Sequence, residues 1–428
     1  MLPGTVPRLA EPRLELLAGG LRVVIVNGPR QGGKSTLLQA YHREHGGEYL
    51  SLDDEETLRA SLDDPIGFPR YQSRPTLIDE VQRGGDALVR GIKLVVDETN
   101  HRGQFILSGS SRFLTVPNLS ESLAGRAGFI ELWPLASAEL HGGPADFCDQ
   151  VFKDPTALLG RSSVWRREDY LRAITRGGFP EAVELVDPRL RKAWYDGYLA
   201  TVTTRDITDF AQIHQVSALP TLMRLVAARS GGPFVLADVA RGAGLSPATA
   251  KTYAIYLETV FQLGQVPAWS TNLTSKITKS PRMFVTDSGL AAHLLNVSED
   301  ALLPAGHPAL GGLVETFVYT ELLKLRTFSE TPFEIHHYRD RDGREIDFIL
   351  ESSDGRVVGL EVKASSSPGS EASKHLRWLK DRLGDRMLAG AVLHLGTFAG
   401  SHGGGIYSMP VSSLWGHAGP WPGSGTSR

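Results

Sequence analysis

The sequence predicts an α/β protein in three parts: a parallel-sheet domain, a helical and winged-helix middle region, and a second α/β domain at the C-terminus. Short apolar runs alternate with amphipathic stretches from Leu21 to about Leu140, a pattern typical of parallel strands joined by helical crossovers. Aromatic residues with helical spacing follow between about Ser163 and Ala211. In the C-terminal part, charged and apolar residues alternate with the period of two that is typical of strands. The two runs are Glu345-Ile346-Asp347-Phe348 and Leu360-Glu361-Val362-Lys363.

The bulk composition is that of folded domains. Hydrophobic residues make up 41% and charged residues 22% of the 428 residues, and a chain of this length exceeds one ordinary core. We therefore expect three domains, over residues 1–160, 161–285 and 286–418, followed by a loose tail over 419–428. The net charge of -3 gives no overall attraction to nucleic acid. Any nucleic-acid contact must come from a local basic patch.

Cysteine content and apolar runs bear on the cellular compartment. Cys148 is the only cysteine, which excludes an intramolecular disulfide and a zinc site built from several cysteines. Residues 1–15 lack the basic and then apolar pattern of a signal peptide, and no run reaches the roughly 18 apolar residues of a membrane span. We expect a cytoplasmic protein without a membrane partner. An oligomer is compatible with the sequence.

The first functional motif is a phosphate-binding loop. It lies between the β-branched run VVIV and the helical run STLLQAY, which is the context that G-x-x-x-x-G-K-[ST] requires. Backbone N–H groups of such a loop surround phosphate oxygens at a helix N-terminus. We expect Lys34 to bridge the β- and γ-phosphates of ATP and the Ser35 hydroxyl to bind Mg²⁺. The nucleotide-binding residues predicted are Gly28, Pro29, Arg30, Gln31, Gly32, Gly33, Lys34, Ser35 and Thr36.

Two acids end the next apolar strand, in the run Pro75-Thr76-Leu77-Ile78-Asp79-Glu80. Asp79 can hold Mg²⁺ through water, and Glu80 can polarise the attacking water. A solvated turn is the alternative for these two carboxylates. A third strand, residues 104–107, ends in Ser108-Gly109-Ser110-Ser111. Ser110 is expected to sense the γ-phosphate, although Ser-Gly-Ser is also ordinary turn chemistry.

The middle region predicts a winged helix. VLADVARGAG and SPATAKTYAIYLETV read as two helices around a turn, with Ser246 as N-cap and Pro247 in the first helical position. Residues 219–282 contain seven Lys or Arg against two acids, a local excess that favours DNA contact. Candidate recognition residues are Ser246, Thr249, Lys251 and Thr252. The alternative is a winged helix that only packs against its neighbours.

Motifs along most of the chain resemble one family. They are GPRQGGKSTL, LIDEVQR, GQFILSGSS, ESLAGRAGFIELWPLASAEL, GGFPEAV, TTRDITDF, FVTDSGLAAHLL, GGLVETFVYTELL, YRDRDGREIDFILE and GLEVKAS. In this order they resemble the AAA-type P-loop ATPases with a C-terminal DUF4143 domain, and the likeness extends from Arg8 to Trp415. The resemblance implies an AAA-like ATPase core, a helical and winged-helix middle, and a C-terminal fold similar to restriction endonucleases.

The resemblance also makes Arg126, and secondarily Arg205, candidates for an arginine finger or phosphate sensor. A structural salt bridge is the alternative for both.

The predicted C-terminal hairpin carries a possible second active centre. With a turn centred on Asp354, Asp347 lies opposite Glu361 and Glu345 lies opposite Lys363. Asp347, Glu361 and Lys363 would then form the D…E-x-K arrangement of restriction-endonuclease-like nucleases, in which two carboxylates hold Mg²⁺ and the lysine helps to activate water. Glu315, on the preceding helix, is a further candidate metal ligand. The alternative is an exposed hairpin with cross-strand ion pairs.

Two functions follow from these motifs. The first is an ATP- and Mg²⁺-dependent ATPase whose nucleotide state controls a DNA-binding or nuclease-like module. The second is a nucleotide-switched interaction or regulatory protein whose C-terminal domain does not cut nucleic acid.

Overall fold

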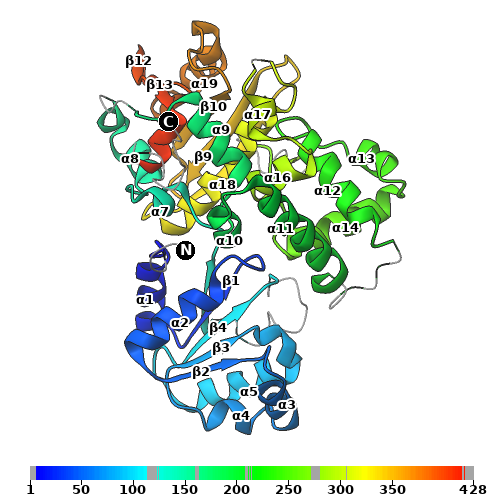
Figure 1. The fold of residues 1–428 in the computed structure, drawn as a ribbon. Coiled ribbons are helices and arrows are strands. Elements are labelled where there is room, and N and C mark those ends of the chain that lie inside the picture. Colours follow the sequence, from blue (N-terminus) through cyan, green and yellow to red (C-terminus); the bar gives the residue numbers. More distant parts are fainter. Residues whose placement is uncertain are drawn as a thin grey trace. The chain divides into compact units, whose positions relative to one another are not determined.

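The computed structural model describes residues 6–112, 123, 125–159, 163–207, 211, 213, 215–270, 280–304, 306–416 and 419, except for the Arg205 side chain. The chain forms two compact units (Figure 1). Among the described residues, the N-terminal unit contains 6–134 and Thr259–Phe261, and the C-terminal unit contains Leu135–Glu258 and the chain from Gln262 onward. Both units combine helices and sheets, so the predicted α/β class is confirmed. The three predicted domain boundaries stay predictions.

A parallel five-stranded sheet forms the centre of the N-terminal unit, in the order β2-β3-β4-β1-β5. Strand β1 lies between β4 and β5 and is buried along its whole length. Because all strands run in one direction, their carboxyl ends meet at one edge of the sheet. The strands are β1 (Val23–Asn27), β2 (Glu48–Ser51), β3 (Thr76–Asp79), β4 (Phe105–Gly109) and β5 (Ala127–Glu131).

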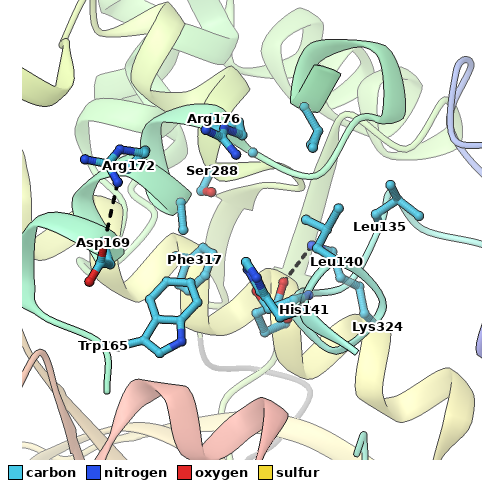
Figure 2. A pocket seen from close by; sticks show the side chains of 15 residues that line it. Leu135, Leu140, His141, Trp165, Asp169, Arg172, Arg176, Ser288, Phe317 and Lys324 are labelled. Carbon is cyan, nitrogen blue, oxygen red and sulfur yellow. Dashed lines mark hydrogen bonds and ion pairs between the residues drawn. The ribbon is translucent and has the colours of Figure 1, made fainter. Parts of the chain in front are cut away.

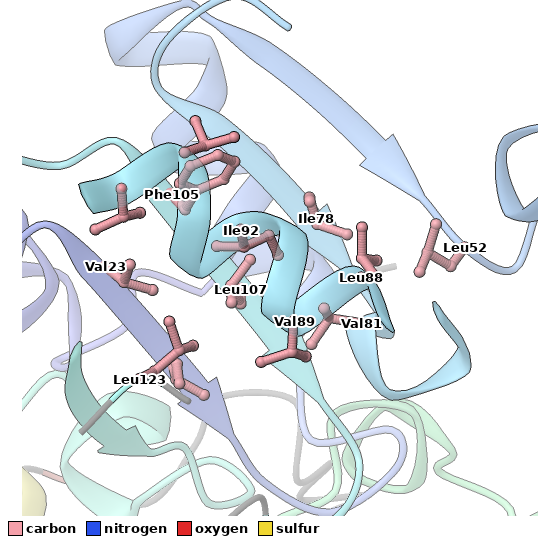
Figure 3. Close-up of a cluster of buried hydrophobic side chains, with 13 residues drawn as sticks. Val23, Leu52, Ile78, Val81, Leu88, Val89, Ile92, Phe105, Leu107 and Leu123 are labelled. Carbon is pink, nitrogen blue, oxygen red and sulfur yellow. The ribbon is translucent and has the colours of Figure 1, made fainter. Parts of the chain in front are cut away.

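Helices cover both faces of this sheet. On one face, α5 packs Leu88, Val89 and Ile92 against strand residues that include Ile78 and Leu107 (Figure 3). Helices α1 and α2 pack on the strands from the other face. The helices of this unit are α1 (Glu11–Gly20), α2 (Lys34–His45), α3 (Glu55–Asp63), α4 (Gly67–Arg70), the 3-10 helix η1 (Val81–Gly84) and α5 (Gly85–Glu98).

The first half of the C-terminal unit is helical. Three of its helices, α12 to α14, are followed by a two-stranded antiparallel sheet of β6 and β7. The elements are α7 (Ser137–His141), α8 (Phe147–Lys153), η3 (Pro155–Leu158), α9 (Arg167–Arg176), α10 (Pro180–Glu184), α11 (Pro188–Thr201), the π-helix η4 (Val202–Asp206), α12 (Ala218–Ala228), α13 (Leu236–Gly242), α14 (Pro247–Thr259), β6 (Leu263–Val266), β7 (Arg282–Val285), α16 (Ser288–Leu294) and α17 (Glu299–Leu302).

A mixed six-stranded sheet completes this unit, in the order β12-β13-β11-β10-β9-β8. Helix α18 precedes the sheet, and α19 connects β10 to the parallel strand β11 and packs on it. The elements are α18 (Leu310–Phe328), β8 (Phe333–Arg339), β9 (Glu345–Ser352), β10 (Val357–Lys363), η5 (Ser370–Ser373), α19 (Lys374–Leu383), η6 (Gly384–Arg386), β11 (Met387–His394), β12 (Gly400–Gly403), β13 (Ile406–Pro410) and η7 (Val411–Trp415).

Within the described residues, we find no helix with the length and apolar character needed to cross a membrane.

Candidate nucleotide site and carboxylate cluster

The predicted phosphate loop joins β1 to α2 at the carboxyl edge of the parallel sheet. Its first residue, Gly28, donates its N–H to the Gly109 carbonyl at 3.3 Å. A Cβ at Gly28 would lie 2.0 Å from the Leu132 carbonyl oxygen, so a side chain does not fit there. Gly33, with φ of 95°, precedes the first residue of α2 in a left-handed conformation that glycine adopts without strain. The loop therefore presents a helix N-terminus at the sheet edge.

Two cationic side chains donate hydrogen bonds to backbone carbonyls of this loop. The Lys34 ammonium is buried and donates hydrogen bonds to the carbonyls of Gly28 and Pro29, each at 3.0 Å. The buried Arg8 guanidinium bonds the carbonyl of Gly32 at 2.8 Å and the carbonyl of Trp133 at 2.7 Å. Arg8 thus ties the loop to the segment after β5. Ser35 is half-buried and Thr36 exposed in the first turn of α2.

Asp79 ends β3 beside the loop. It is buried, and its carboxylate accepts hydrogen bonds from the hydroxyls of Tyr49, at 3.0 Å, and Ser108. Burial and the Asp79 charge raise the pKa of Tyr49, so this phenol remains a donor. Neutral donors fix the carboxylate without cancelling its charge. Asp79 therefore stays available to attract a cation.

Glu80 and Ser110 meet across two strand ends. Glu80 has a left-handed backbone, with φ of 53°, which turns its side chain away from the direction of β3. The Ser110 hydroxyl donates to the Glu80 carboxylate at 3.1 Å, and the Gln82 side-chain amide bonds both groups. Ser110 thus contacts the predicted base itself, so the structure brings two of the sequence-predicted residues together.

Some polar residues at this edge were not predicted to act in the site. Tyr49, Gln82 and Arg8 hold the predicted groups, as described above, and Gln82 has a sequence signal because it lies within two residues of Glu80. Ser108 belongs to the polar strand end that was predicted to sense the γ-phosphate, and its hydroxyl bonds Asp79. In addition, the buried side-chain carbonyl oxygens of Asn27 and Gln82 have no hydrogen-bond partner, although such groups are normally satisfied. One buried acceptor at the end of β1 and another after β3 therefore lack a hydrogen bond.

Arg126 lies at the opposite edge of the same sheet. It precedes β5, and its carbonyl accepts the N–H of Val23 at the start of β1, whereas the phosphate loop follows the end of β1. Its guanidinium forms a two-pronged ion pair with Asp97, at 2.6 and 3.0 Å. Arg126 therefore does not face the phosphate loop of its own unit. The backbone of Arg205 lies in η4, but its side chain is outside the described residues.

The C-terminal unit contains a buried carboxylate cluster around Arg282. The β9–β10 register runs from Val357 opposite Glu351 to Leu360 opposite Phe348, which centres the turn on Asp354 as predicted. Beyond this pairing, the Asp347 carboxylate accepts the N–H of Val362, next to Glu361, at 2.8 Å. The almost fully buried Arg282, from β7, pairs with Glu345, with Asp347 at 3.2 Å and with Glu315 at 3.7 Å. Three elements, α18, β7 and β9, meet at this one guanidinium.

The other groups of the cluster remain short of partners. Lys363 pairs with Glu361 at 2.6 Å, not with Glu345. One carboxylate oxygen each of Glu315 and Glu361 is buried without a hydrogen bond. Burial, and next the Asp347 charge, raise the pKa of Glu315 to about 8 and that of Glu361 to about 7. Four carboxylates thus lie around two cations, and the raised pKa values keep a proton on Glu315, and partly on Glu361, near pH 7.

The cluster differs from the predicted metal site in two ways. Asp347 and Glu361 are buried, so the alternative of an exposed hairpin is wrong. The neighbours of Asp347 include Arg282 of β7, which pairs with it at 3.2 Å. Among the described residues, however, only the exposed Glu15, Glu44 and His45 bring three ligand atoms within 4.8 Å of one another. The Arg282 guanidinium separates the carboxylates of the cluster, so a metal would require them to draw closer.

The predicted recognition residues lie at the start of α14. The Ser246 hydroxyl accepts the N–H of Thr249 at 3.1 Å, which is the predicted N-cap, and Pro247 opens the helix. Ser246, Lys251 and Thr252 are exposed, and Thr249 is half-buried. These side chains are therefore accessible to a partner.

Family comparisons cover most of the chain. An AAA domain matches residues 21–141, a domain of unknown function called DUF8612 matches residues 167–301, and the domain of unknown function DUF4143 matches residues 310–414. The first match contains the phosphate loop and the acids of β3, and the last contains the carboxylates of α18, β9 and β10. The chain thus combines an AAA domain with a C-terminal DUF4143 domain. The AAA domain supports nucleotide binding and hydrolysis.

Relatives of this DUF4143-containing ATPase occur in bacteria and archaea. An uncharacterized protein of Mycobacterium tuberculosis is 28% identical over 367 residues, which cover 86% of this chain and 76% of that protein. An uncharacterized protein of Methanocaldococcus jannaschii is 24% identical over 219 residues, covering 48% of this chain and 46% of that protein.

Solved structures resemble this ATPase only distantly. The Walker-type ATPase of Pyrococcus abyssi is 13% identical, covers 67% of this chain and 94% of its own, and gives a TM-score of 0.36. The RuvB Holliday junction branch migration motor of Thermotoga maritima is 20% identical, covers 60% of this chain and 89% of its own, and gives a TM-score of 0.29. Scores this low carry no conclusion about what this ATPase acts on.

Proposed function

We propose that the N-terminal unit hydrolyses ATP with Mg²⁺. The observation that carries this proposal is the convergence of the phosphate loop, the Asp79–Ser108 pair and the Glu80–Ser110 pair at one edge of the parallel sheet. ATP phosphates would take the Lys34 ammonium from the carbonyls of Gly28 and Pro29, because a polyphosphate is the stronger acceptor. The loop N–H groups at the start of α2 would hold the remaining phosphate oxygens.

Mg²⁺ fits the donors present. The Ser35 hydroxyl and, through water, the Asp79 carboxylate are the oxygen ligands that Mg²⁺ prefers, and the unpartnered Asn27 oxygen can accept from a bound water. When bound, the ion neutralises phosphate charge. Glu80 would orient the attacking water and accept its proton. Ser110 and Gln82 would hold the Glu80 carboxylate in place until the water arrives.

Two variants test this assignment. Lys34→Ala should abolish ATP binding by a folded protein, because the remaining loop lacks its phosphate cation. Glu80→Gln should keep ATP·Mg²⁺ bound but slow hydrolysis by about 10²-fold or more. Isothermal titration measures the first effect and phosphate release the second. Glu98→Gln, an exposed acid in the same unit that pairs with Arg70, is the control. Unchanged binding in Lys34→Ala, or parental turnover in Glu80→Gln, would contradict the assignment.

For the C-terminal unit, we propose a nucleic-acid-binding module in which Asp347, Glu361 and Glu315 hold a divalent cation and Lys363 lies beside the reacting phosphodiester. The crowding of four carboxylates around two cations, and the buried Glu361 oxygen without a hydrogen bond, support a cation there. The accessible start of α14 and the exposed Arg224, Arg241 and Lys251 support a nucleic-acid partner. In this proposal, nucleotide state in the AAA domain controls the module.

One observation favours the second candidate, a nucleotide-switched interaction protein. Arg282 already places a positive charge among Glu345, Asp347 and Glu315, where a nuclease would need its metal. An arginine cannot activate water as a divalent ion does. In this case, the cluster would fasten β7 to the sheet and the domain would bind a partner without cutting.

DNA cleavage separates the two candidates. Single- and double-stranded DNA are incubated with Mn²⁺, with and without ATP, beside an Asp347→Ala, Glu361→Ala variant. Cutting by the parent that the double variant lacks supports the nuclease. ATPase activity that rises with DNA but without cutting supports a binding module. If DNA changes neither activity, the switched interaction protein remains.

A further inference from the structure

A small hollow lies inside the C-terminal unit, away from the carboxylate cluster. It measures about 30 Å³, where one water needs roughly 10–15 Å³, so it has room for a few atoms only. Its walls come from α7, α9, α16 and α18. Apolar side chains make up much of the wall, including Leu140, Trp165 and Phe317, and several charged groups join them (Figure 2).

Most charges around the hollow are already paired. Arg172 pairs with Asp169 at 3.5 Å and with Glu299 at 3.3 Å. Lys324 pairs with Glu321 at 2.7 Å, and both residues are buried. The second Glu321 oxygen accepts the backbone N–H of Ser137 at 2.8 Å. These acids therefore have no free capacity for another cation in the wall.

Arg176 is the exception. Within the described residues, its guanidinium makes no hydrogen bond or ion pair, and its Nε atom is buried without a partner. Burial, and next the charges of Arg191 and Arg172, lower the pKa of Arg176. The carboxylate of Glu299 acts against this shift, but it pairs with Arg172. A half-buried cation without a counter-ion is costly. An anion in the hollow would remove that cost.

His141 offers a second unpartnered group. Its Nδ1 atom is buried without a hydrogen-bond partner, and its ring meets the Trp165 ring edge-on at 4.8 Å. Burial, and next the Arg176 charge, lower the pKa of His141 to about 4, so the imidazole is neutral near pH 7 and can donate one hydrogen bond. In the view of Figure 2, Arg176 and Ser288 lie at one end of the hollow, with His141 and Trp165 at the other.

We propose that this hollow binds the carboxylate group of a small organic acid. The Arg176 fork matches two carboxylate oxygens. The Ser288 hydroxyl lies at the same end of the hollow, and the His141 imidazole lies at the other end. One unpaired cation balances the single charge of a carboxylate, whereas a phosphate dianion would need a second. The Trp165, Phe317 and Leu140 side chains suit a short apolar body. The site is independent of the proposed ATPase and nuclease chemistry.

Thermal unfolding with defined anions tests this proposal. Formate and acetate are compared with chloride and inorganic phosphate at matched ionic strength. At least one carboxylate should raise Tm by about 2–4 °C above chloride, and phosphate should not. Arg176→Gln should lose this response. Without added carboxylate, its Tm should equal or exceed that of the parent, because an unpaired charge has been removed.

Two further variants sharpen the result. Arg176→Lys keeps the charge but not the fork, so a reduced response is expected. Arg189→Gln changes an exposed arginine of the same unit, paired with Asp187, and should respond like the parent. The proposal is overturned if no carboxylate stabilises the parent beyond chloride, if phosphate does so equally, or if Arg176→Gln keeps the response.

Discussion

At the scale of single residues, Arg8 shows how a side chain outside the motif can set the geometry of the phosphate loop. Its guanidinium bonds the carbonyl of Gly32 on one side and that of Trp133 on the other. A loop that must point its N–H groups inward needs its carbonyls held outward, and Arg8 holds one of them. Arg8 therefore acts as a positioning residue and touches no substrate in the proposed mechanism.

Arg8→Gln is expected to weaken nucleotide binding by about tenfold, since losing a buried hydrogen bond costs about 1–3 kcal/mol and 1.4 kcal/mol is a factor of ten. Turnover at saturating ATP should change less than affinity. Titration with a fluorescent ATP analogue measures the effect. Arg13→Gln, an exposed arginine on α1, is the matched control. Parental affinity in a folded Arg8→Gln protein would show that the loop holds its shape alone.

His141 contributes to acid sensitivity, together with His337, whose pKa is also lowered to about 4, chiefly by burial. The pKa of His141 is lowered to about 4 in the folded protein, against about 6.5 in an unfolded chain. As pH falls from 6.5 towards 4, the unfolded chain takes up this proton and the folded one does not, so stability is lost over that window. Above pH 6.5 the contribution is complete.

His141→Gln should therefore flatten the decline of the unfolding midpoint between pH 6.5 and 4, as measured by chemical denaturation. His402→Gln, at an exposed position, should decline like the parent. Equal slopes in His141→Gln and the parent would mean that other groups dominate acid unfolding.

At the scale of elements, buried and regular segments were predictable and edge strands were not. Strand β1 and helix α2 were predictable because β-branched residues run directly into the phosphate-loop motif. The hairpin register followed from the turn at Asp354. Strand β2 was missed because its four residues are only half-buried and carry no alternation. Strand β5 was missed because Gly128 interrupts it and because an outer strand pairs on one side only.

The residues of the candidate sites divide in a similar way, into those that a local motif predicts and those that only the fold brings together. Lys34, Asp79 and Glu80 could be predicted because a local motif or a strand end places them. Arg282 could not, since it stands 63 positions before Glu345, its partner. Only the folded arrangement of β7 against β9 brings them together. Long-range ion pairs leave no periodic signal in one sequence.

Helix α5 provides a test of the core at the element scale (Figure 3). Ile92 is fully buried against the sheet, whereas Leu94, two residues along the same helix, is 47% exposed. Ile92→Ala should lower the free energy of unfolding by about 2–5 kcal/mol, because it leaves a cavity. Leu94→Ala should cost far less, since its side chain is already in water. Urea denaturation followed by circular dichroism compares the two; equal losses would contradict the placement of α5.

At the scale of the whole molecule, each compact unit carries its own candidate chemistry. The N-terminal unit collects oxygen and cation donors for a nucleotide at a sheet edge, and the C-terminal unit concentrates four carboxylates around two cations. The first arrangement keeps two buried acceptors, of Asn27 and Gln82, without a hydrogen bond, whereas Arg282 already pairs with three carboxylates of the second. The decisive question for the second unit is therefore whether Arg282 replaces a metal ion or competes with one.

Arg282→Met answers this question. The substitution keeps an unbranched side chain of similar length but removes the charge that holds Glu345, Asp347 and Glu315 apart. If the cluster is a cation site, Mn²⁺ without nucleotide should bind Arg282→Met at least tenfold more tightly than the parent, because the ion no longer competes with a guanidinium.

Metal-free Arg282→Met should be less stable, since uncompensated buried carboxylates cost several kcal/mol, and Mn²⁺ should restore its Tm. Isothermal titration and thermal unfolding measure these effects, and adding Asp347→Asn and Glu361→Gln should abolish the Mn²⁺ binding. Weak Mn²⁺ binding that Arg282→Met leaves unchanged would mean that the cluster is a structural ion-pair network, and the nuclease proposal would then lose its metal.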